Sequence, residues 1–431
     1  MSAVPTHRTV WRLAGPIILA NLSVPLLGAV DTAVVGHLPD PAYLGGVAVG
    51  AVIFGFIYWG FGFLRMGTTG LVAQAAGAGR DDEARLVLLR ALAIAGAFGV
   101  GLWALQAPIF WTARTLFDAS AEVEAQAALY FHVRVWSAPA ALANYALIGW
   151  FIGMRNTRAA LFLQLWMNGL NIVLALTFVV GLGWGVAGVA TATMLSEYAA
   201  VGGAILLLYG RLRITAGARL LERAQLMRLL TLNLDIFIRT LCLITAFALF
   251  TREGAGFGDT TLAANAVLMQ FLHFLSFGLD GFAHAAEALV GTALGARNRG
   301  ALRAAVRITV QWALIVALGY AAAYAVLGTP IIALLTDIAE VRATAAAYFP
   351  WLLALPLIAV WPFMLDGIFI GATRTRDMRN AMILSFAIYL AALLALKPLW
   401  GNHGLWAALV VFMTARGITL ALRYRKIERE F

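Results

Sequence analysis

One acidic residue stands out because apolar and small residues surround it. The stretch LLGAVDTAVVG, Leu26 to Gly36, contains a single acid, Asp31. An ionised carboxylate in hydrocarbon costs roughly 3 kcal/mol or more. In a dry environment a carboxyl group favours its neutral form, and it ionises when it is wetted or paired with a cation. Asp31 is therefore a candidate for a group whose charge changes with its surroundings.

Two asparagines are candidate partners for this carboxyl group. Asn168 and Asn171 lie three residues apart in LWMNGLNIVLAL, so a helix would place both on one face. Amides in such segments also hydrogen-bond a neighbouring helix, and this structural role is an alternative of equal weight.

A second group of polar residues lies in HFLSFGLDGFAHAAEALVG. Its spacings of 7, 4 and 3 would put all members within about 60° on one helix face. The members are His273, Asp280, His284 and Glu287. Coupling-ion binding, substrate binding and structural pairing all remain open for them. A metal site is disfavoured because there is no H-E-x-x-H motif and no cysteine ligand.

Three further acids lie in apolar segments. Asp366, in LDGIFIG, is expected to face the same region as the His and acid group. Glu197 and Asp235 are expected to reach the interface or to pair with an arginine. Asp235 precedes Arg239 by four residues, so an ion pair within one helix is predicted for these two.

The composition predicts that these residues lie in membrane-spanning helices. Of 431 residues, 62% are hydrophobic and 12% are charged, against about 45–50% and about 25% in soluble proteins. A span needs about 20 apolar residues, and twelve segments satisfy this. They run approximately 14–38, 43–71, 86–110, 126–150, 159–182, 185–209, 229–252, 260–292, 304–328, 345–370, 381–400 and 404–422. The fold class is thus an all-α polytopic membrane protein.

The positive charge is distributed unevenly over the loops. Most of the 31 Arg and Lys residues fall in the termini and the even-numbered loops. By the positive-inside rule both termini are cytoplasmic, and a bacterial inner membrane is expected. The net charge of +10 then reflects topology and contact with anionic lipids, and nucleic acid is not expected as a partner.

The chain contains an internal repeat. GWFIGMRNTR, beginning at Gly149, aligns with GIFIGATRTR, beginning at Gly367, a shift of 218 residues, and LVAQAAGAG at Leu71 aligns with LVGTALGAR at Leu289. Two six-helix lobes are predicted, at 1–210 and 229–431, joined by a cytoplasmic linker at 211–228. Parallel repeats of this kind are typical of alternating-access transporters. Motifs for nucleotide binding and for serine hydrolysis are missing, so catalysis is not expected.

Several motifs together resemble the MATE (multidrug and toxic compound extrusion) transporters and look most like their DinF branch. The motifs are VDTAVVGHL, GAGRDDEAR, GWGVAGVA, DGFAHAAEALVG and LDGIFIGATRTRDMRN. The resemblance implies two pseudo-symmetric lobes forming a V, and export of amphipathic, often cationic small molecules driven by inward proton or sodium flow. Neither a cofactor nor a resident metal is implied, and a monomer is expected.

The resemblance also implies roles for individual residues. Asp31 matches the aspartate that binds the coupling ion, Pro16 matches the proline at which the first helix bends, and Pro25 is a second candidate hinge. The polar partners would be Asn171, Thr193 and Asn144, with Asn168 beside them. One position departs from the pattern. Many relatives have an acid where this chain has Ala175, which weakens a two-carboxylate sodium site and favours protons.

Two alternatives to multidrug export remain. A flippase for lipid-linked oligosaccharides, from the same superfamily, would need a cationic cleft for a pyrophosphate. Apart from the bases that belong to the loop clusters at the span ends, the predicted spans contain six acids against four bases, Arg65, Arg134, Arg239 and Arg416, which disfavours this alternative. A membrane enzyme or scaffold is a more distant alternative.

Overall fold

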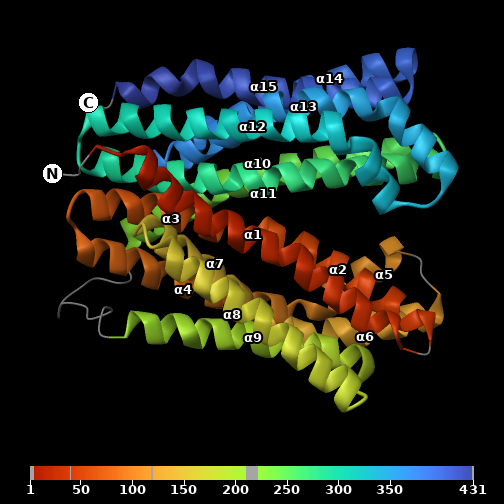
Figure 1. Ribbon diagram of the computed structural model, residues 1–431. Helices are drawn as coiled ribbons and strands as arrows, with labels where there is room; N and C mark the ends of the chain where they lie inside the picture. The colour runs from red at the N-terminus through yellow and green to blue at the C-terminus, as the bar shows by residue number, and fades with distance from the viewer. Residues whose placement is uncertain (1–3, 39, 118–119, 210–221, 430–431) are drawn as a thin grey trace. The chain divides into compact units, whose positions relative to one another are not determined.

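A computed structural model describes residues 4–38, 40–117, 120–209 and 222–429, and within these residues the chain is helical and has no strand (Figure 1). The helices of the first half are α1 (His7–Gly36), α2 (Pro41–Gly60), α3 (Phe63–Gly77), α4 (Asp81–Ala104), α5 (Gln106–Phe117), α6 (Ala121–Arg134), η1 (Val135–Ser137), α7 (Ala138–Gly153), α8 (Thr157–Ala175), η2 (Leu176–Gly181) and α9 (Gly185–Leu208). Those of the second half are α10 (Arg223–Ala255), α11 (Asp259–Gly295), α12 (Arg299–Leu335), α13 (Ala339–Gly371), α14 (Thr375–Trp400) and α15 (Asn402–Glu428).

The twelve predicted spans are confirmed, since twelve helical segments of the described chain are long and apolar enough to cross a membrane. Three spans of the first half are built from more than one element. The second consists of α2 and α3, the fourth of α6, η1 and α7, and the fifth of α8 and η2. The third span ends at Ala104, earlier than predicted, and the short α5 follows it.

The chain forms two compact units. The carboxy-terminal unit consists of Met1–Ile18, Gly77–Gly79 and Thr231–Phe431, and the amino-terminal unit consists of Leu19–Ala76 and Arg80–Leu230. Helix α1 contributes its first part to one unit and its second part to the other. The predicted linker at 211–228 lies mostly outside the described residues, and α10 begins at Arg223. The predicted lobe boundaries therefore stay predictions.

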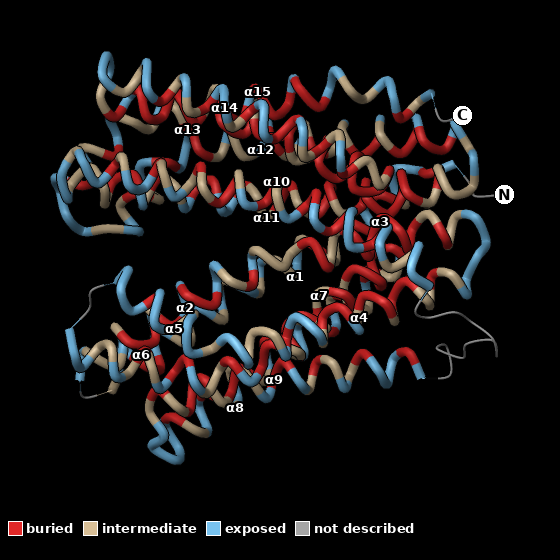
Figure 2. Tube along the Cα trace, turned by 180° about the vertical axis from the view of Figure 1, so that it is seen from behind, coloured by how far each residue is buried: buried red, intermediate tan, exposed pale blue. Residues whose placement is uncertain are grey.

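Many large apolar side chains lie on the outer surface of the helices. Leu206, Leu334 and Leu422 are 75%, 86% and 77% exposed. Exposed apolar area of this extent would be unfavourable in water but suits contact with lipid. The interior is formed by other helices, and Figure 2 shows buried residues gathered along α7, whose sixteen residues are mostly buried.

The internal repeat is visible in how glycines let helices approach. A Cβ atom on Gly149 would lie 2.4 Å from the carbonyl oxygen of Arg65, and one on Gly367 would lie 2.4 Å from that of Ala283. Gly149 and Gly367 are 218 residues apart in the sequence, and so are their contact partners, Arg65 and Ala283. One turn later, Gly153 and Gly371 repeat this approach to the next helix. These glycines are therefore needed because the backbones of the packed helices meet there.

The turns repeat as well. Left-handed backbone conformations occur at positions related by the same shift in both halves, three pairs in all. The pairs and their φ angles are Gly79 (70°) with Arg297 (50°), Arg155 (59°) with Thr373 (52°), and Gly183 (69°) with Gly401 (57°). Both halves thus use one backbone design, as the sequence repeat predicts.

The glycine contacts lead to a stability prediction. Gly149→Ala and Gly367→Ala should each destabilise the protein by about 1–3 kcal/mol, because the new methyl group meets a backbone carbonyl that cannot rotate away. Gly96→Ala is the matched control, since a Cβ atom there meets nothing within 4 Å; alanine should be neutral or slightly stabilising in that helix. Thermal unfolding in detergent measures all three. Equal melting temperatures for the three variants would contradict the packing described.

Candidate functional site

Asp31 lies in the part of α1 that belongs to the amino-terminal unit. The residue is half-buried, and its Oδ1 atom is buried without a hydrogen-bond partner among the described residues. A buried carboxylate oxygen normally accepts a hydrogen bond or pairs with a cation. This oxygen atom can therefore still accept a proton or bind a cation.

Asn168 connects α8 to α1. Its Nδ2 atom donates to the Ser23 hydroxyl at 2.8 Å, and its Oδ1 atom accepts from Gln164 at 3.2 Å. Ser23 lies eight residues before Asp31 on the same helix, so this bond fixes the part of α1 that leads to the carboxyl group. Ser23 could not be singled out from the sequence, because hydroxyl groups are common in helices and their partners cannot be inferred from residue spacing.

Asn171 connects α8 to α9. Its Nδ2 atom donates to the Thr193 hydroxyl at 3.1 Å, and this hydroxyl donates to the Val189 carbonyl oxygen at 3.0 Å. The Oδ1 atom of Asn171 is buried without a partner in the described part of the chain. Both asparagines therefore join helices, as the structural alternative expected, and Asn171 keeps one acceptor unused.

Asn144, on α7, contributes to the same interior. Its Nδ2 atom donates to the backbone carbonyl oxygen of Glu197 at 3.0 Å. Glu197 follows Thr193 by one turn of α9, so Asn144 and Asn171 hold α9 at neighbouring turns. Asn144, Asn171 and Thr193 thus gather at α9, whereas Asn168 bonds to α1. The Oδ1 atom of Asp31 has no hydrogen bond to any of them within the described residues.

Glu197 forms a buried ion pair with Arg134, at the end of α6. The Nη2 atom of Arg134 donates to Oε1 of Glu197 at 3.2 Å, and Nη1 donates to the Tyr130 hydroxyl at 3.1 Å. The guanidinium carbon lies 5.3 Å from the ring centre of Phe54 and 5.9 Å from those of Tyr58 and Tyr130. Three aromatic rings therefore surround this cation, an arrangement that favours positive charge.

Arg134 also interacts electrostatically with Asp31. The expectation that Glu197 pairs with an arginine is confirmed, but the closeness of this pair to Asp31 was not predicted. A sequence signal did exist. Arg134 lies well inside a predicted span, and a base there needs a nearby acid for the same reason that Asp31 needs an explanation.

Asp366, in the carboxy-terminal unit, is neutralised by two arginines. Its Oδ2 atom accepts from Nη2 of Arg239 and, at 2.8 Å, from Nη2 of Arg416. The side chains of Asp366, Arg239 and Arg416 are 10%, 8% and 4% exposed. Both arginines bond to Oδ2, and Oδ1 is buried without a hydrogen-bond partner within the described residues. Two buried guanidinium groups beside one carboxylate argue against a role in binding a coupling cation.

The predicted ion pair between Asp235 and Arg239 is wrong. Asp235 accepts instead from Nη1 of Arg379 at 2.6 Å and from the Thr375 hydroxyl at 3.1 Å. A spacing of four residues permits a pair on one helix but does not prevent a better partner on a neighbouring helix. Arg379 and Thr375, at the start of α14, meet Asp235 from a neighbouring helix, and Arg239 is left for Asp366.

The four polar residues of α11 lie in different environments. Glu287 is buried, Asp280 and His284 are half-buried, and His273 is exposed. Nε2 of His284 lies 4.0 Å from Oε1 of Glu287, one turn away. Within the described residues no group of three or more His, Cys, Asp or Glu side chains converges as metal ligands would. Their role in coupling or substrate binding stays a prediction.

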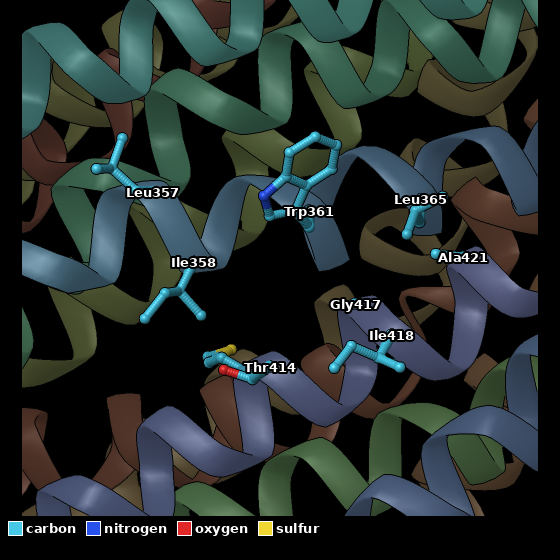
Figure 3. A pocket seen from close by; sticks show the side chains of 9 residues that line it. Leu357, Ile358, Trp361, Leu365, Thr414, Gly417, Ile418 and Ala421 are labelled. Atoms are coloured by element: carbon cyan, nitrogen blue, oxygen red, sulfur yellow. The ribbon is translucent and has the colours of Figure 1, made fainter.

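An apolar pocket of about 390 Å³ lies between α13 and α15 (Figure 3). Its walls include Trp361 and Leu365 from α13, and Ile418 and Ala421 from α15. Met413, also in the wall, accepts a hydrogen bond from Nη1 of Arg416 through its sulfur at 3.3 Å. Met413 thus connects the pocket wall to the buried ion pairs, and the lining of the pocket is mostly apolar, with the Thr414 hydroxyl as a polar group.

Helix α1 continues through both predicted hinge residues. It is helical from His7 to Gly36, past Pro16 and Pro25. The helix passes from the carboxy-terminal to the amino-terminal unit between Ile18 and Leu19, two residues after Pro16. Because a proline removes a helix hydrogen bond, Pro16 is well placed for a bend, and bending stays a prediction.

Known proteins share both the sequence and the fold. The sequence model of the MatE family matches residues 16–177 and 236–395, once in each half of the repeat. The DNA damage-inducible protein F of Escherichia coli is 43% identical over 98% of this chain and 92% of its own length. The probable multidrug resistance protein NorM of Pseudomonas aeruginosa is 27% identical over 97% of this chain and 89% of its own.

A solved structure has the same fold. It is that of a MOP superfamily transporter from Pyrococcus furiosus, with a TM-score of 0.88, 20% identity, and coverage of 98% of this chain and 96% of the other. The twelve spans, the repeated glycine contacts and the two family matches agree on one conclusion. This chain is a polytopic membrane protein that belongs to the MatE family.

Proposed function

We propose that this protein is a secondary active antiporter that exports amphipathic, often cationic small molecules across a bacterial inner membrane. Relatives over nearly the full length include proteins named for multidrug resistance, and this supports the substrate class. The observation that carries the proposal is the half-buried Asp31, whose buried Oδ1 atom has no partner in the described chain. Such a carboxyl group gains or loses a proton, or a cation, at little structural cost.

Protons are the coupling ion we propose, with sodium as the alternative. A sodium ion is held by several oxygen ligands, and the position at which many relatives have a second acid is Ala175, which is buried. A single carboxyl group can bind a proton without further ligands. Inward proton flow would protonate Asp31 and remove its charge, and α1 would then repack, with Pro16 as the bend. Protonation shifts the transporter between states because the two states differ in proton affinity.

The uneven charge of the loops supports an orientation with both termini in the cytoplasm. Export therefore means movement from the side of the termini to the opposite side. The flippase alternative requires free positive charge for a pyrophosphate. Two of the four arginines in the spans, Arg239 and Arg416, are both hydrogen-bonded to Asp366 and nearly fully buried, so they do not supply it.

The first test removes the charge change at Asp31. In proteoliposomes with an imposed pH difference, Asp31→Asn should reduce transport of the cationic dye ethidium to the level of empty vesicles, because asparagine cannot bind a proton. Asp40→Asn is the matched control, since Asp40 is an exposed helix cap that asparagine can replace. Insertion of both variants should equal that of the wild type. Unchanged transport by Asp31→Asn would remove this residue from the mechanism.

The coupling ion is tested separately. At a fixed pH difference, ethidium transport should be the same with and without sodium, because Asp31 needs no further cation ligands to bind a proton. The initial rate of dye transport is the measurement. A rate that rises with sodium when the pH difference is absent would replace proton coupling by sodium coupling.

Asp366 should behave differently from Asp31. Asp366→Asn leaves Arg239 and Arg416 without a buried counter-charge, which should destabilise the protein by about 3–5 kcal/mol. Its melting temperature in detergent should fall, while Asp259→Asn, at an exposed residue, should leave it unchanged. Transport per folded molecule should persist. Loss of proton-driven transport with an unchanged melting temperature would place coupling at Asp366 instead.

A further inference from the structure

In the amino-terminal unit two acids, Asp31 and Glu197, interact with one base, Arg134, and these three residues are called the amino-terminal cluster. Glu197 forms an ion pair with Arg134 at 3.2 Å, and their side chains are 10% and 16% exposed. Asp31 interacts electrostatically with the same arginine. With both acids ionised the cluster carries one net negative charge, and such a charge is unfavourable in a membrane-spanning lobe.

Each member of the cluster has an unused polar atom. Oδ1 of Asp31, Oε2 of Glu197 and Nε of Arg134 are buried without a hydrogen-bond partner among the described residues. Arg134 therefore keeps donor capacity beyond its bond to Glu197, and both acids keep acceptor capacity. The aromatic rings of Phe54, Tyr58 and Tyr130 keep the guanidinium in place and favour its charge.

We propose that Asp31 and Glu197 share Arg134 as a counter-charge and together bind one proton in each transport cycle. This inference rests on the proposed antiport and adds Glu197 and Arg134 as positioning residues for the proton. One proton removes the single excess negative charge and leaves a neutral cluster. Many relatives have a second acid at the position of Ala175, on α8. In this chain Glu197, on α9, would supply that second acid instead.

The other titratable groups around Glu197 do not change this charge balance. Tyr58 on α2, Tyr130 on α6, Tyr145 on α7 and Tyr198 on α9 are near enough to interact with Arg134 or Glu197. Phenol groups are neutral over the pH range in which carboxyl groups titrate. Arg65, on α3, interacts electrostatically with Tyr145.

We expect opposite effects from neutralising the acid Glu197 and from removing the base Arg134. Glu197→Gln leaves one acid and one base, which are already neutral together, so a proton would create an excess positive charge. Arg134→Met leaves two acids without a base, so a proton is bound more readily. At a constant pH difference, the pH of half-maximal ethidium transport should fall by about one unit in Glu197→Gln and rise by about one unit in Arg134→Met.

Two exposed residues provide matched controls. Glu122→Gln and Arg158→Met make the same chemical changes outside the cluster, at exposed positions, and should leave the pH of half-maximal transport unchanged. If Arg134→Met fails to fold because Glu197 loses its partner, the double variant Arg134→Met with Glu197→Gln replaces it. There Asp31 stands alone with one negative charge, and the pH of half-maximal transport should be higher than in Glu197→Gln.

The outcomes separate this inference from the proposed antiport. If Asp31→Asn is inactive while Glu197→Gln and Arg134→Met shift the pH dependence in opposite directions, both are supported. If Asp31→Asn is inactive but neither variant, nor the double variant, moves the pH dependence, the shared counter-charge is wrong and the antiport stands. If Asp31→Asn retains proton-driven transport, the proposed coupling itself fails.

Discussion

The cost of a charge in hydrocarbon determines how the polar residues of this protein are arranged. Each acid in a span must be neutralised, paired or used. Asp366 is paired with two arginines, Asp235 with Arg379, and Glu197 with Arg134. Asp31 differs from these three because it forms no ion pair within the described residues, and its buried Oδ1 atom also has no hydrogen-bond partner there. It is the acid for which a structural explanation is missing, and therefore the one for which a functional explanation is needed.

The two halves share their backbone conformation but not the positions of their charged residues. The glycine contacts and left-handed turns recur at a shift of 218 residues. The charged residues of the amino-terminal cluster have no charged counterparts at that shift. Asp31, Arg134 and Glu197 correspond to Leu249, Leu352 and Ala415. The repeat thus supplies a scaffold of two similar helix bundles, and the proton binding that we propose would take place in one of them, where a change of charge can act on α1.

Most of the fold could be predicted from the sequence, because span length and composition are local properties. The internal repeat could also be predicted, because the two halves contain matching sequence motifs. Ion partners could not be predicted in this way. Asp235 pairs with Arg379, which is distant in the sequence, and not with Arg239 on its own helix. The choice of partner depends on which helices pack together. Ser23 was missed for the same reason.

The functional roles of the candidate site residues stay predictions. Asn171 and Thr193 are hydrogen-bonded to each other, and the match to the MatE family confirms the resemblance from which their roles were inferred. The ion pair between Arg134 and Glu197 could not be recognised from the number of bases in the spans alone, because that number does not say which acid each base contacts. Three of the four, Arg134, Arg239 and Arg416, form ion pairs with acids that the sequence had already identified. Matching each buried base to a buried acid would have placed Glu197 among the candidates.

The most direct test is to record proton movement itself. A pH-sensitive dye inside proteoliposomes should report a change in lumen pH when ethidium is supplied to the wild type, because each transported molecule exchanges for protons bound at Asp31. No change should occur with Asp31→Asn. A substrate-driven pH change of equal size in both proteins would contradict the account.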